Sequence, residues 1–304
     1  MSAEGHIPAP PGDFILPFDL PAAGLRGRIV RLDATSARAL SAHALPEPAS
    51  RILGETLALA ALLGTALKLD GRLTVQTKST GALDLITVDY YGAVEGKAKG
   101  VRGFARLNDA KFATLGTSPS FEQLMGAGSL AITIEPRTGG QNYQGIVALS
   151  PDGIGASAET YFGQSEQLPT AIKLAAAPLF EAGRSAPSWR AGGIMLQVTP
   201  DAQRSDDDWD RLSMFLKTVE AIELVDTSLP AETLLWRLFH EDETRVLPAE
   251  PITFRCDCDG ERIASILKSY SDEDREGLAD PDGVIRARCE FCATVHEIDK
   301  ARLS

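Results

Sequence analysis

All four cysteines of the chain lie near its C-terminal end, in two short pairs. Cys256 and Cys258 form the first pair, Cys289 and Cys292 form the second, and residues 259–288 separate the two. A zinc ion prefers four tetrahedral ligands, and two closely spaced pairs of thiolates supply them. The sequence therefore predicts one zinc ion held by all four cysteines.

The spacing within the two pairs differs, and the difference bears on redox chemistry. Two residues separate Cys289 from Cys292, as in ordinary zinc ribbons, whereas Asp257 alone separates Cys256 from Cys258. Without metal, so tight a pair can bring its Cα atoms near the window of about 4.4–6.8 Å that a disulfide requires. The spacing suits a reversible switch as well as an inert structural zinc site, and both interpretations stay open here.

Folding energetics distinguish a switch from a static site. Zinc bound across the two pairs can contribute about 10–16 kcal/mol to the folding of a small domain. A disulfide within each pair would close a loop of only three or four residues, is worth about 2 kcal/mol, and joins nothing distant. Oxidation of this kind would loosen the cysteine-bearing domain and anything docked against it.

The remaining candidates for catalysis are weak, and we expect the protein not to be an enzyme. His296 follows the last cysteine closely, but four thiolates already complete the ligand set, so a surface or supporting role is favoured. His6, His43 and His240 are scattered through the chain. The sequence contains no phosphate-binding glycine loop, so use of ATP is not expected. It also contains no recognisable arrangement of serine, histidine and acid for nucleophilic catalysis.

Composition limits the partners and the compartment. The chain has 304 residues, a net charge of −12 and a pI near 4.9, which opposes binding to nucleic acid or to an anionic membrane. Its longest uncharged apolar run, residues 56–67, is shorter than the roughly 20 residues needed to cross a bilayer. Residues 1–13 do not resemble a signal peptide. We therefore expect a soluble, cytoplasmic protein, in which reduced cysteines serve metal or redox chemistry.

Periodicity predicts an α+β fold with a mostly antiparallel sheet core, packed helices, a helical linker and a small C-terminal zinc domain. Residues 138–141 predict a hairpin turn, and Thr35 or Ser36 is expected to cap the first helix. The expected strands are 28–32, 73–77, 83–91, 94–104, 130–134, 143–149, 171–176 and 193–198, and the expected helices are 36–44, 50–69 and 156–167.

The domain organisation follows from shifts in composition. We expect a disordered tail at 1–13, an α+β core at 14–203, an acidic helical linker at 204–254 and a four-cysteine zinc and redox domain at 255–304. Residues 204–250 contain twelve acidic and five basic side chains. This acidic load is expected to make docking of the linker weak.

Two amphipathic helices are expected in the linker. The first begins at Asp206 or Asp207 and its apolar stripe extends to Val219 and Ile222, and the second begins at Pro230. Their apolar side chains are expected to be buried in one state and exposed in another, which makes them candidates for binding unfolded proteins. These candidates are Trp209, Leu212, Leu216, Leu234, Leu235, Leu238 and Phe239.

Three further segments accompany the C-x-C and C-x-x-C pairs, and together they resemble a known family. The segments are 161–170 (YFGQSEQLPT), 191–198 (AGGIMLQV) and 234–241 (LLWRLFHE). From about Asp13 to the C-terminus, the chain is similar to the redox-regulated 33-kilodalton heat-shock chaperones of bacteria. The resemblance implies an α+β N-terminal domain, a metastable linker and a C-terminal zinc domain whose ligands are the four cysteines.

The resemblance also implies how the protein works. The reduced, zinc-loaded form is expected to be an inactive monomer. Oxidation is expected to release zinc, form two local disulfides, unfold the linker and yield an active dimer. That dimer would hold unfolding clients without ATP until they pass to the ATP-dependent chaperone system.

The chain departs from the family pattern at three places. Asp259 and Gly260 replace the usual Ser-Arg after the first pair, and Ala293 stands where a glycine usually follows the last cysteine. The loop 79–82 also lacks the usual Gly-Asp-Gly. We expect the turn at Ala293 to be made differently, and zinc affinity and oxidant sensitivity to change while the ligand set does not.

Two other functions compete with an oxidation-activated holdase. One is a zinc-ribbon protein associated with nucleic acid, which the acidic charge disfavours. The other is a thiol oxidoreductase that uses Cys289 and Cys292, but no thioredoxin-like βαβ unit precedes them.

Overall fold

A computed structural model describes residues 12–67, 69–180, 183, 187–200 and 206–303. Most of the predicted tail, 1–13, lies outside the described residues. The chain divides into two compact units, Met1–Arg255 and Cys256–Ser304. The separate status predicted for residues 204–254 as a linker remains a prediction.

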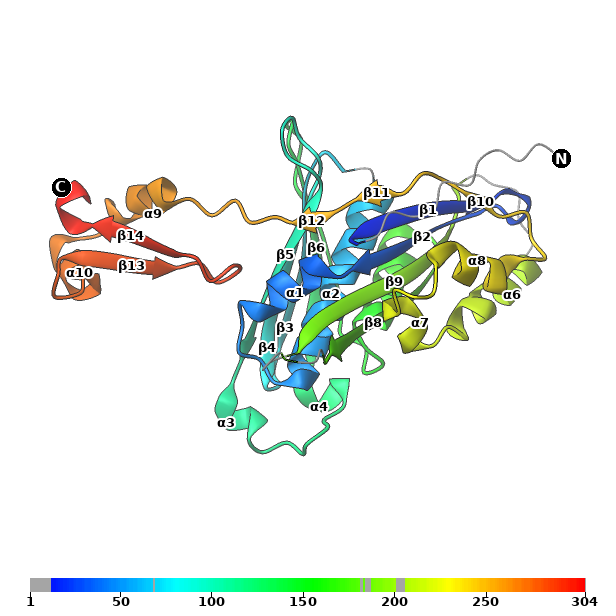
Figure 1. Ribbon diagram of the computed structural model, residues 1–304, viewed down its shortest axis with the longest axis horizontal. Helices are drawn as coiled ribbons and strands as arrows, with labels where there is room; N and C mark the ends of the chain where they lie inside the picture. Colours follow the sequence, from blue (N-terminus) through cyan, green and yellow to red (C-terminus); the bar gives the residue numbers. More distant parts are fainter. Residues whose placement is uncertain (1–11, 68, 181–182, 184–186, 201–205, 304) are drawn as a thin grey trace. The chain divides into compact units, whose positions relative to one another are not determined.

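Two six-stranded sheets form the first unit (Figure 1). One sheet has the order β10-β1-β2-β9-β8, with β11 also pairing with β1, and the other has the order β12-β5-β4-β3-β6-β7. All of these pairings are antiparallel except that of β12 with β5. The longer strands are β1 (Phe14–Leu20), β2 (Leu25–Leu32), β3 (Gly71–Ser79), β4 (Leu83–Tyr91), β5 (Gly100–Leu107), β6 (Gly128–Pro136), β7 (Tyr143–Ala148), β8 (Thr170–Leu179) and β9 (Ser188–Val198).

Helix α2 (Glu47–Ala66) supplies much of the main core. Its leucine and alanine side chains are buried around most of its circumference and pack with residues of both sheets. The other helices of this part are α1 (Ala34–Ser41), α3 (Asp109–Phe112), α4 (Phe121–Met125) and α5 (Ile154–Tyr161), which continues into a π-helix at Phe162–Glu166. The predicted α+β class with largely antiparallel sheets is confirmed.

The structure corrects several sequence predictions in this unit. Strand β1 was not predicted, because Phe14–Leu20 does not alternate and contains Pro17. Thr35 and Ser36 lie inside α1, which is capped instead by the distant carboxylate of Asp13. That carboxylate accepts from the backbone nitrogens of Asp33 and Thr35 and from the Thr35 hydroxyl.

Three helices, not two, follow β9 in the acidic segment: α6 (Asp206–Lys217), α7 (Ala221–Val225) and α8 (Ala231–Phe239). Glu220 and Glu223 form a capping box that starts α7 afresh. The stripe predicted to run to Ile222 therefore breaks, and Ile222 is 60% exposed. Leu212, Leu216 and other apolar residues of these helices form a second core with β1, β2, β8 and β9.

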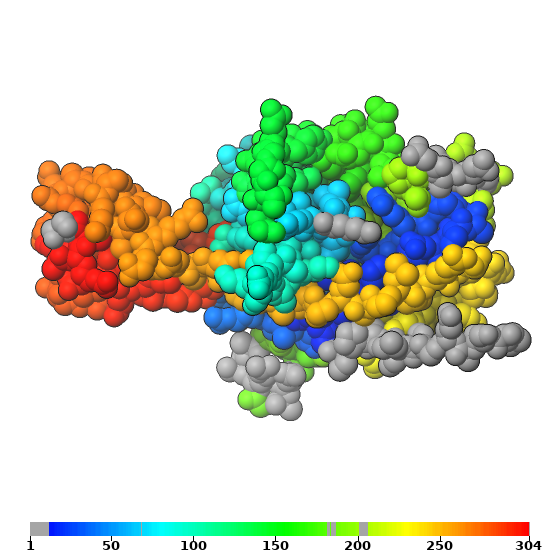
Figure 2. Space-filling view, turned by 90° about the horizontal axis from the view of Figure 1, so that it is seen from above, coloured from blue at the N-terminus to red at the C-terminus, as the bar shows by residue number. Residues whose placement is uncertain are grey.

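A short extended strap joins these helices to the end of the unit. It contains β10 (Arg245–Val246) and β11 (Glu250–Pro251), which pair with β1, and β12 (Thr253–Phe254), which pairs with β5. Figure 2 shows this gold segment lying across the surface of the unit. Because the strap pairs with both sheets, it ties the acidic segment to each of them.

The second unit is small. It contains α9 (Gly260–Leu267), α10 (Asp272–Leu278), the hairpin of β13 (Val284–Arg288) and β14 (Val295–Asp299), and a 3₁₀ helix at Lys300–Leu303. Its buried hydrophobic cluster consists of Leu267, Ile285, Ile298 and Leu303. So small a core gives little stability by itself, and domains of this size commonly depend on a metal or on disulfides.

Candidate metal and redox centre

The four cysteines meet at one place in the second unit. Cys256 and Cys258 precede α9, and Cys289 and Cys292 lie in the turn between β13 and β14. All four sulfur atoms lie within 4.8 Å of one another. The sulfurs of Cys256 and Cys289 are 3.7 Å apart, and those of Cys258 and Cys292 are 3.5 Å apart.

These distances fit a tetrahedral zinc site. A zinc–sulfur bond of about 2.3 Å places the sulfurs of a regular tetrahedron about 3.8 Å apart. The cysteines are free thiols, so no covalent cross-link holds the sulfurs together. A donor set of four sulfurs at this spacing suits zinc, and the residues that would hold it are Cys256, Cys258, Cys289 and Cys292.

The turn that presents the second pair is built around Ala293. The backbone nitrogen of Cys289 donates to the carbonyl of Thr294 at 2.8 Å, and that of Ala293 donates to the carbonyl of Cys289 at 2.9 Å. Ala293 has a φ of +60°, in the left-handed region that favours glycine. Alanine here adopts a strained backbone that glycine would take at lower cost. The expectation that the turn differs from that of relatives with glycine remains a prediction.

Cys292 and Cys258 differ in pKa because their surroundings differ. Burial opposes ionisation of Cys292, but hydrogen bonds with the side chain and backbone of Thr294 and with neighbouring sulfurs outweigh it and lower the pKa to about 6. Thr294 Oγ1 lies 3.2 Å from the sulfur and can donate to a thiolate. Burial and the other cysteines raise the pKa of Cys258. Without a cation, the cluster therefore favours an unequal sharing of protons.

Two arginines near the cysteine pairs, Arg286 and Arg255, have oxygen partners of their own. Arg286 donates to Asp280, Asp282 and Glu297, so it is already neutralised by carboxylates. Arg255 belongs to the first unit, where its Nη1 donates to the carbonyl of Gly92 at 3.0 Å.

His296 lies against the start of α9. A Cβ added at Gly260 would lie 3.2 Å from its Nδ1, and its buried Nε2 has no hydrogen-bond partner among the described residues. The ring does not belong to the cluster of four sulfurs. Glycine at position 260 leaves room for this ring.

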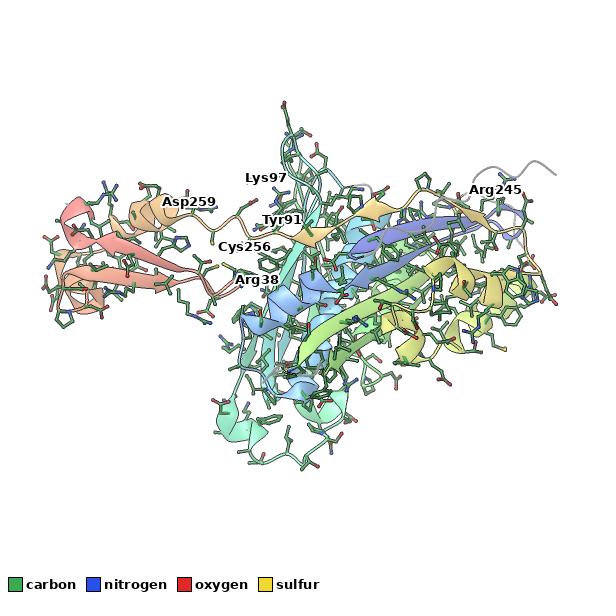
Figure 3. All side chains as sticks on the ribbon, in the orientation of Figure 1. Arg38, Tyr91, Lys97, Arg245, Cys256 and Asp259 are labelled. Atoms are coloured by element: carbon green, nitrogen blue, oxygen red, sulfur yellow. The ribbon has the colours of Figure 1, made fainter. Side chains whose placement is uncertain are left out.

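The strap ends at Arg255, directly before the first cysteine of the centre. The Arg255 guanidinium lies 4.9 Å from the centre of the Tyr91 ring, and Arg38 lies 5.9 Å from that of Phe254. Figure 3 labels Tyr91, Arg38 and Cys256. Cation–π contacts of this kind fix the end of the strap. The sequence alone gives no sign of this anchoring role of Arg255, because Tyr91 and Gly92 are distant in the chain.

The seven candidate client-binding residues lie in helices α6 and α8. Leu212, Leu216, Leu234, Leu235 and Phe239 are buried, whereas Trp209 and Leu238 are partly buried. The Phe239 ring stacks on Phe18 of β1 with a centroid distance of 5.9 Å. All seven therefore belong to the second core, and none forms a freely exposed patch.

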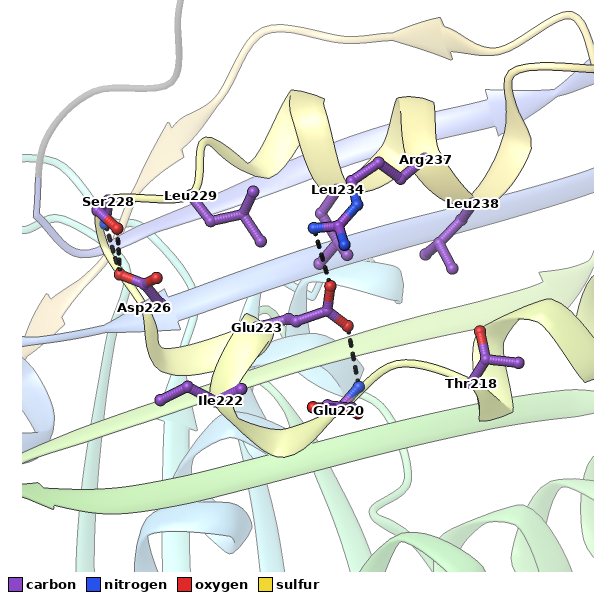
Figure 4. Close-up of a pocket in the computed structure, with 10 residues that line it drawn as sticks. All are labelled: Thr218, Glu220, Ile222, Glu223, Asp226, Ser228, Leu229, Leu234, Arg237 and Leu238. Atoms are coloured by element: carbon purple, nitrogen blue, oxygen red, sulfur yellow. Dashed lines mark hydrogen bonds and ion pairs between the residues drawn. The ribbon is translucent and has the colours of Figure 1, made fainter.

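The outer side of these helices is less closely packed than the side that faces the sheet. A hollow of about 690 Å³ opens between α7 and α8, bordered by Thr218 just after α6. Figure 4 shows Arg237 reaching Glu223 across it, and this ion pair measures 3.0 Å. Open hollows and exposed ion pairs add little stability, so docking depends chiefly on the apolar inner face.

Comparison with known proteins identifies the family. The Hsp33 protein family matches residues 13–299. The chain belongs to the Hsp33 family. It is 35% identical to the 33 kDa chaperonin of Caulobacter vibrioides over 293 residues, which cover 94% of this chain and 95% of that protein. It is also 35% identical to the 33 kDa chaperonin of Shewanella loihica, covering 91% and 89% of the two chains.

A solved structure supports the fold of this Hsp33 protein. The 33 kDa chaperonin of Thermotoga maritima superposes with a TM-score of 0.76, covering 95% of this chain and 96% of that one at 19% identity. The family is one of chaperones, not of enzymes. Among the described residues, no helix of this Hsp33 protein combines the length and the apolar character needed to cross a bilayer.

Proposed function

We propose that this Hsp33 protein is an ATP-independent holdase that oxidation of its four-cysteine zinc centre activates. The observation that carries the proposal is the cluster of four sulfurs at the spacing of a tetrahedral zinc site, in a unit whose buried core has only four hydrophobic residues. Bound zinc would supply one cross-link among four thiolates. Without it, so small a core would lose most of its stability.

Thiol chemistry can remove that cross-link. One thiolate attacks a peroxide and breaks its O–O bond. One oxygen stays on the sulfur as a sulfenic acid, and the other leaves as hydroxide. The second cysteine of the pair then attacks that sulfur and expels a further hydroxide, which completes a disulfide. Two peroxides thus convert four thiolates into two disulfides, proposed to be Cys256–Cys258 and Cys289–Cys292, and no ligand remains for zinc.

Loss of the cross-link is proposed to undock the acidic helices. Cys256 directly follows the strap, and the strap follows α8, so loosening at the cysteines can spread back along the chain. The apolar faces of α6 and α8, together with the strand surface beneath them, then become available to unfolding proteins. Dimerisation of the oxidised form, transfer of clients to an ATP-dependent chaperone and a cytoplasmic location belong to the same proposal.

Light scattering of a heat-denatured client tests this function. Reduced, oxidised and re-reduced protein would be compared with and without ATP. We expect suppression of aggregation by the oxidised form alone, unaffected by ATP. Equal suppression by reduced and oxidised protein would indicate a constitutive holdase, and no suppression by either would favour a purely structural zinc site.

A further inference from the structure

A cavity of about 440 Å³ lies in the first unit, beside the segment 161–170 that the redox account leaves without a role. Aliphatic side chains line much of it, including Leu63 of α2, Leu67 directly after that helix, Leu73 of β3 and Ile134 of β6. Small-molecule sites are typically cavities of about 300–1,000 Å³ with an apolar lining and a few polar groups. The cavity has the size and lining of such a site.

Arg26 contributes a cation to this lining. Its Nε and Nη2 atoms donate to Oε1 of Gln197 at 3.3 and 2.8 Å. Gln197 is only 2% exposed, and its amide nitrogen donates to the Thr170 hydroxyl at 3.0 Å. Within the described part of the chain, no carboxylate pairs with Arg26. An arginine held by a neutral amide keeps charge and donors for an anion.

Arg28 adds a second positive charge on the same face of β2, two residues along the strand. It is 8% exposed, and its buried Nε has no hydrogen-bond partner among the described residues. Burial first, and then the charge of Arg26, lower the pKa of Arg28 to about 10, while Asp19 and Tyr90 act in the opposite direction. The two arginines add positive potential on this face of β2, which Asp19, opposite Arg26 in the register with β1, offsets in part.

Glu166 is the acidic residue of the lining, and two tyrosines already engage it. The hydroxyls of Tyr143 and Tyr161 donate to its Oε1 at 3.1 and 3.0 Å. Glu166 ends the π-helix Phe162–Glu166, a rare conformation often found at functional sites. Gln167 follows with a φ of +52°, a strained backbone for a residue other than glycine. The segment is thus held in an unusual shape that positions Glu166 on the tyrosines.

We propose that this cavity binds a medium-chain aliphatic carboxylate. Arg26 receives the carboxylate, with the charge of Arg28 behind it, and the alkyl chain packs against the leucine and isoleucine side chains. The site lies within the first unit and is independent of the cysteine chemistry. A failure of octanoate binding would therefore leave the proposed holdase function untouched, and the reverse also holds.

Isothermal titration of the reduced, zinc-loaded full-length protein with octanoate tests the site. Octanol and octylammonium, which have the same chain length, serve as comparison ligands. We expect saturable binding of one octanoate per chain, at least tenfold tighter than either comparison ligand. Amide shifts of a ¹⁵N-labelled sample should change on binding in residues 63–67 and 162–168.

Arg26→Met should weaken octanoate binding at least tenfold and remove its preference over octanol. The matched control is Arg106→Met, because Arg106 is an exposed arginine of the same unit that pairs with Asp84. Octanoate binding that survives Arg26→Met, tighter binding of octylammonium, or shifts confined to other residues would overturn the proposal. An absence of saturable octanoate binding to the wild-type protein would overturn it as well.

Discussion

At the residue scale, Ala293 shapes the metal centre through its backbone. A left-handed conformation costs a non-glycine residue roughly 1–2 kcal/mol, part of which glycine would avoid. We expect Ala293→Gly to tighten zinc binding by about 1 kcal/mol, or roughly fivefold. Competition with a chromophoric chelator measures this. Ala287→Gly in the regular strand β13 is the matched control, and equal effects of the two changes would remove the role assigned to Ala293.

Thr294 acts on the neighbouring thiol. Because hydrogen bonds with Thr294 help to lower the pKa of Cys292 to about 6, Thr294→Val should raise that pKa. Titration of thiolate absorbance in reduced, zinc-free protein measures the change. A depressed folded-state pKa gives stability that is present above the ordinary thiol pKa near 9 and is lost as the pH falls through 6. The folded fraction of the zinc-free unit, already small, should therefore fall further from pH 9 to pH 6, and less steeply in Thr294→Val.

The clustering of the four cysteines could be predicted from spacing alone, because two pairs of thiols admit few other uses in a chain of this composition. Thr294 and the αL turn could not, since they depend on the backbone path between β13 and β14. The ion pairs of Arg286 could not be predicted for a similar reason. Its three carboxylate partners meet it only when the hairpin forms.

At the element scale, helix α8 offers a direct test of linker docking. Phe239 is 1% exposed and stacks on Phe18, whereas Trp236 of the same helix is 67% exposed. Replacing a buried phenylalanine by alanine costs about 3–5 kcal/mol. Phe239→Ala should therefore raise amide exchange across α6–α8 in reduced protein and give partial holdase activity without oxidant.

Trp236→Ala is the matched control, because it removes a larger ring from the outer side of the same helix. It should change exchange and activity little. If both variants behave like the wild-type protein when reduced, docking of α8 does not restrain activity.

Long periodic elements were predictable from the sequence, and short ones were not. Strand β4 occupies the residues expected for it, and α2 differs by a few residues at each end. The strands of the strap have two residues each, too few to show a period, and they exist only because β1 and β5 offer edges. The break between α6 and α7 was not predicted, because the apolar stripe of one helix was assumed to continue through the capping box at Glu220.

At the scale of the whole molecule, one strap joins the four cysteines to the three acidic helices along the chain. The second unit has a four-residue core, and the acidic helices rest on an apolar face beneath a hollowed outer surface. Regions of this kind open at lower free energy than the interior of a large core. The two sheets around α2 should therefore keep their structure while the acidic segment changes.

Hydrogen exchange during an oxidant titration tests this central claim most directly. Zinc release, free thiols and suppression of client aggregation would be measured on the same sample. We predict that exchange across 209–239 rises together with zinc release and activity, while exchange across 73–149 stays nearly constant. Equal protection of 209–239 in the reduced and oxidised protein would contradict the account.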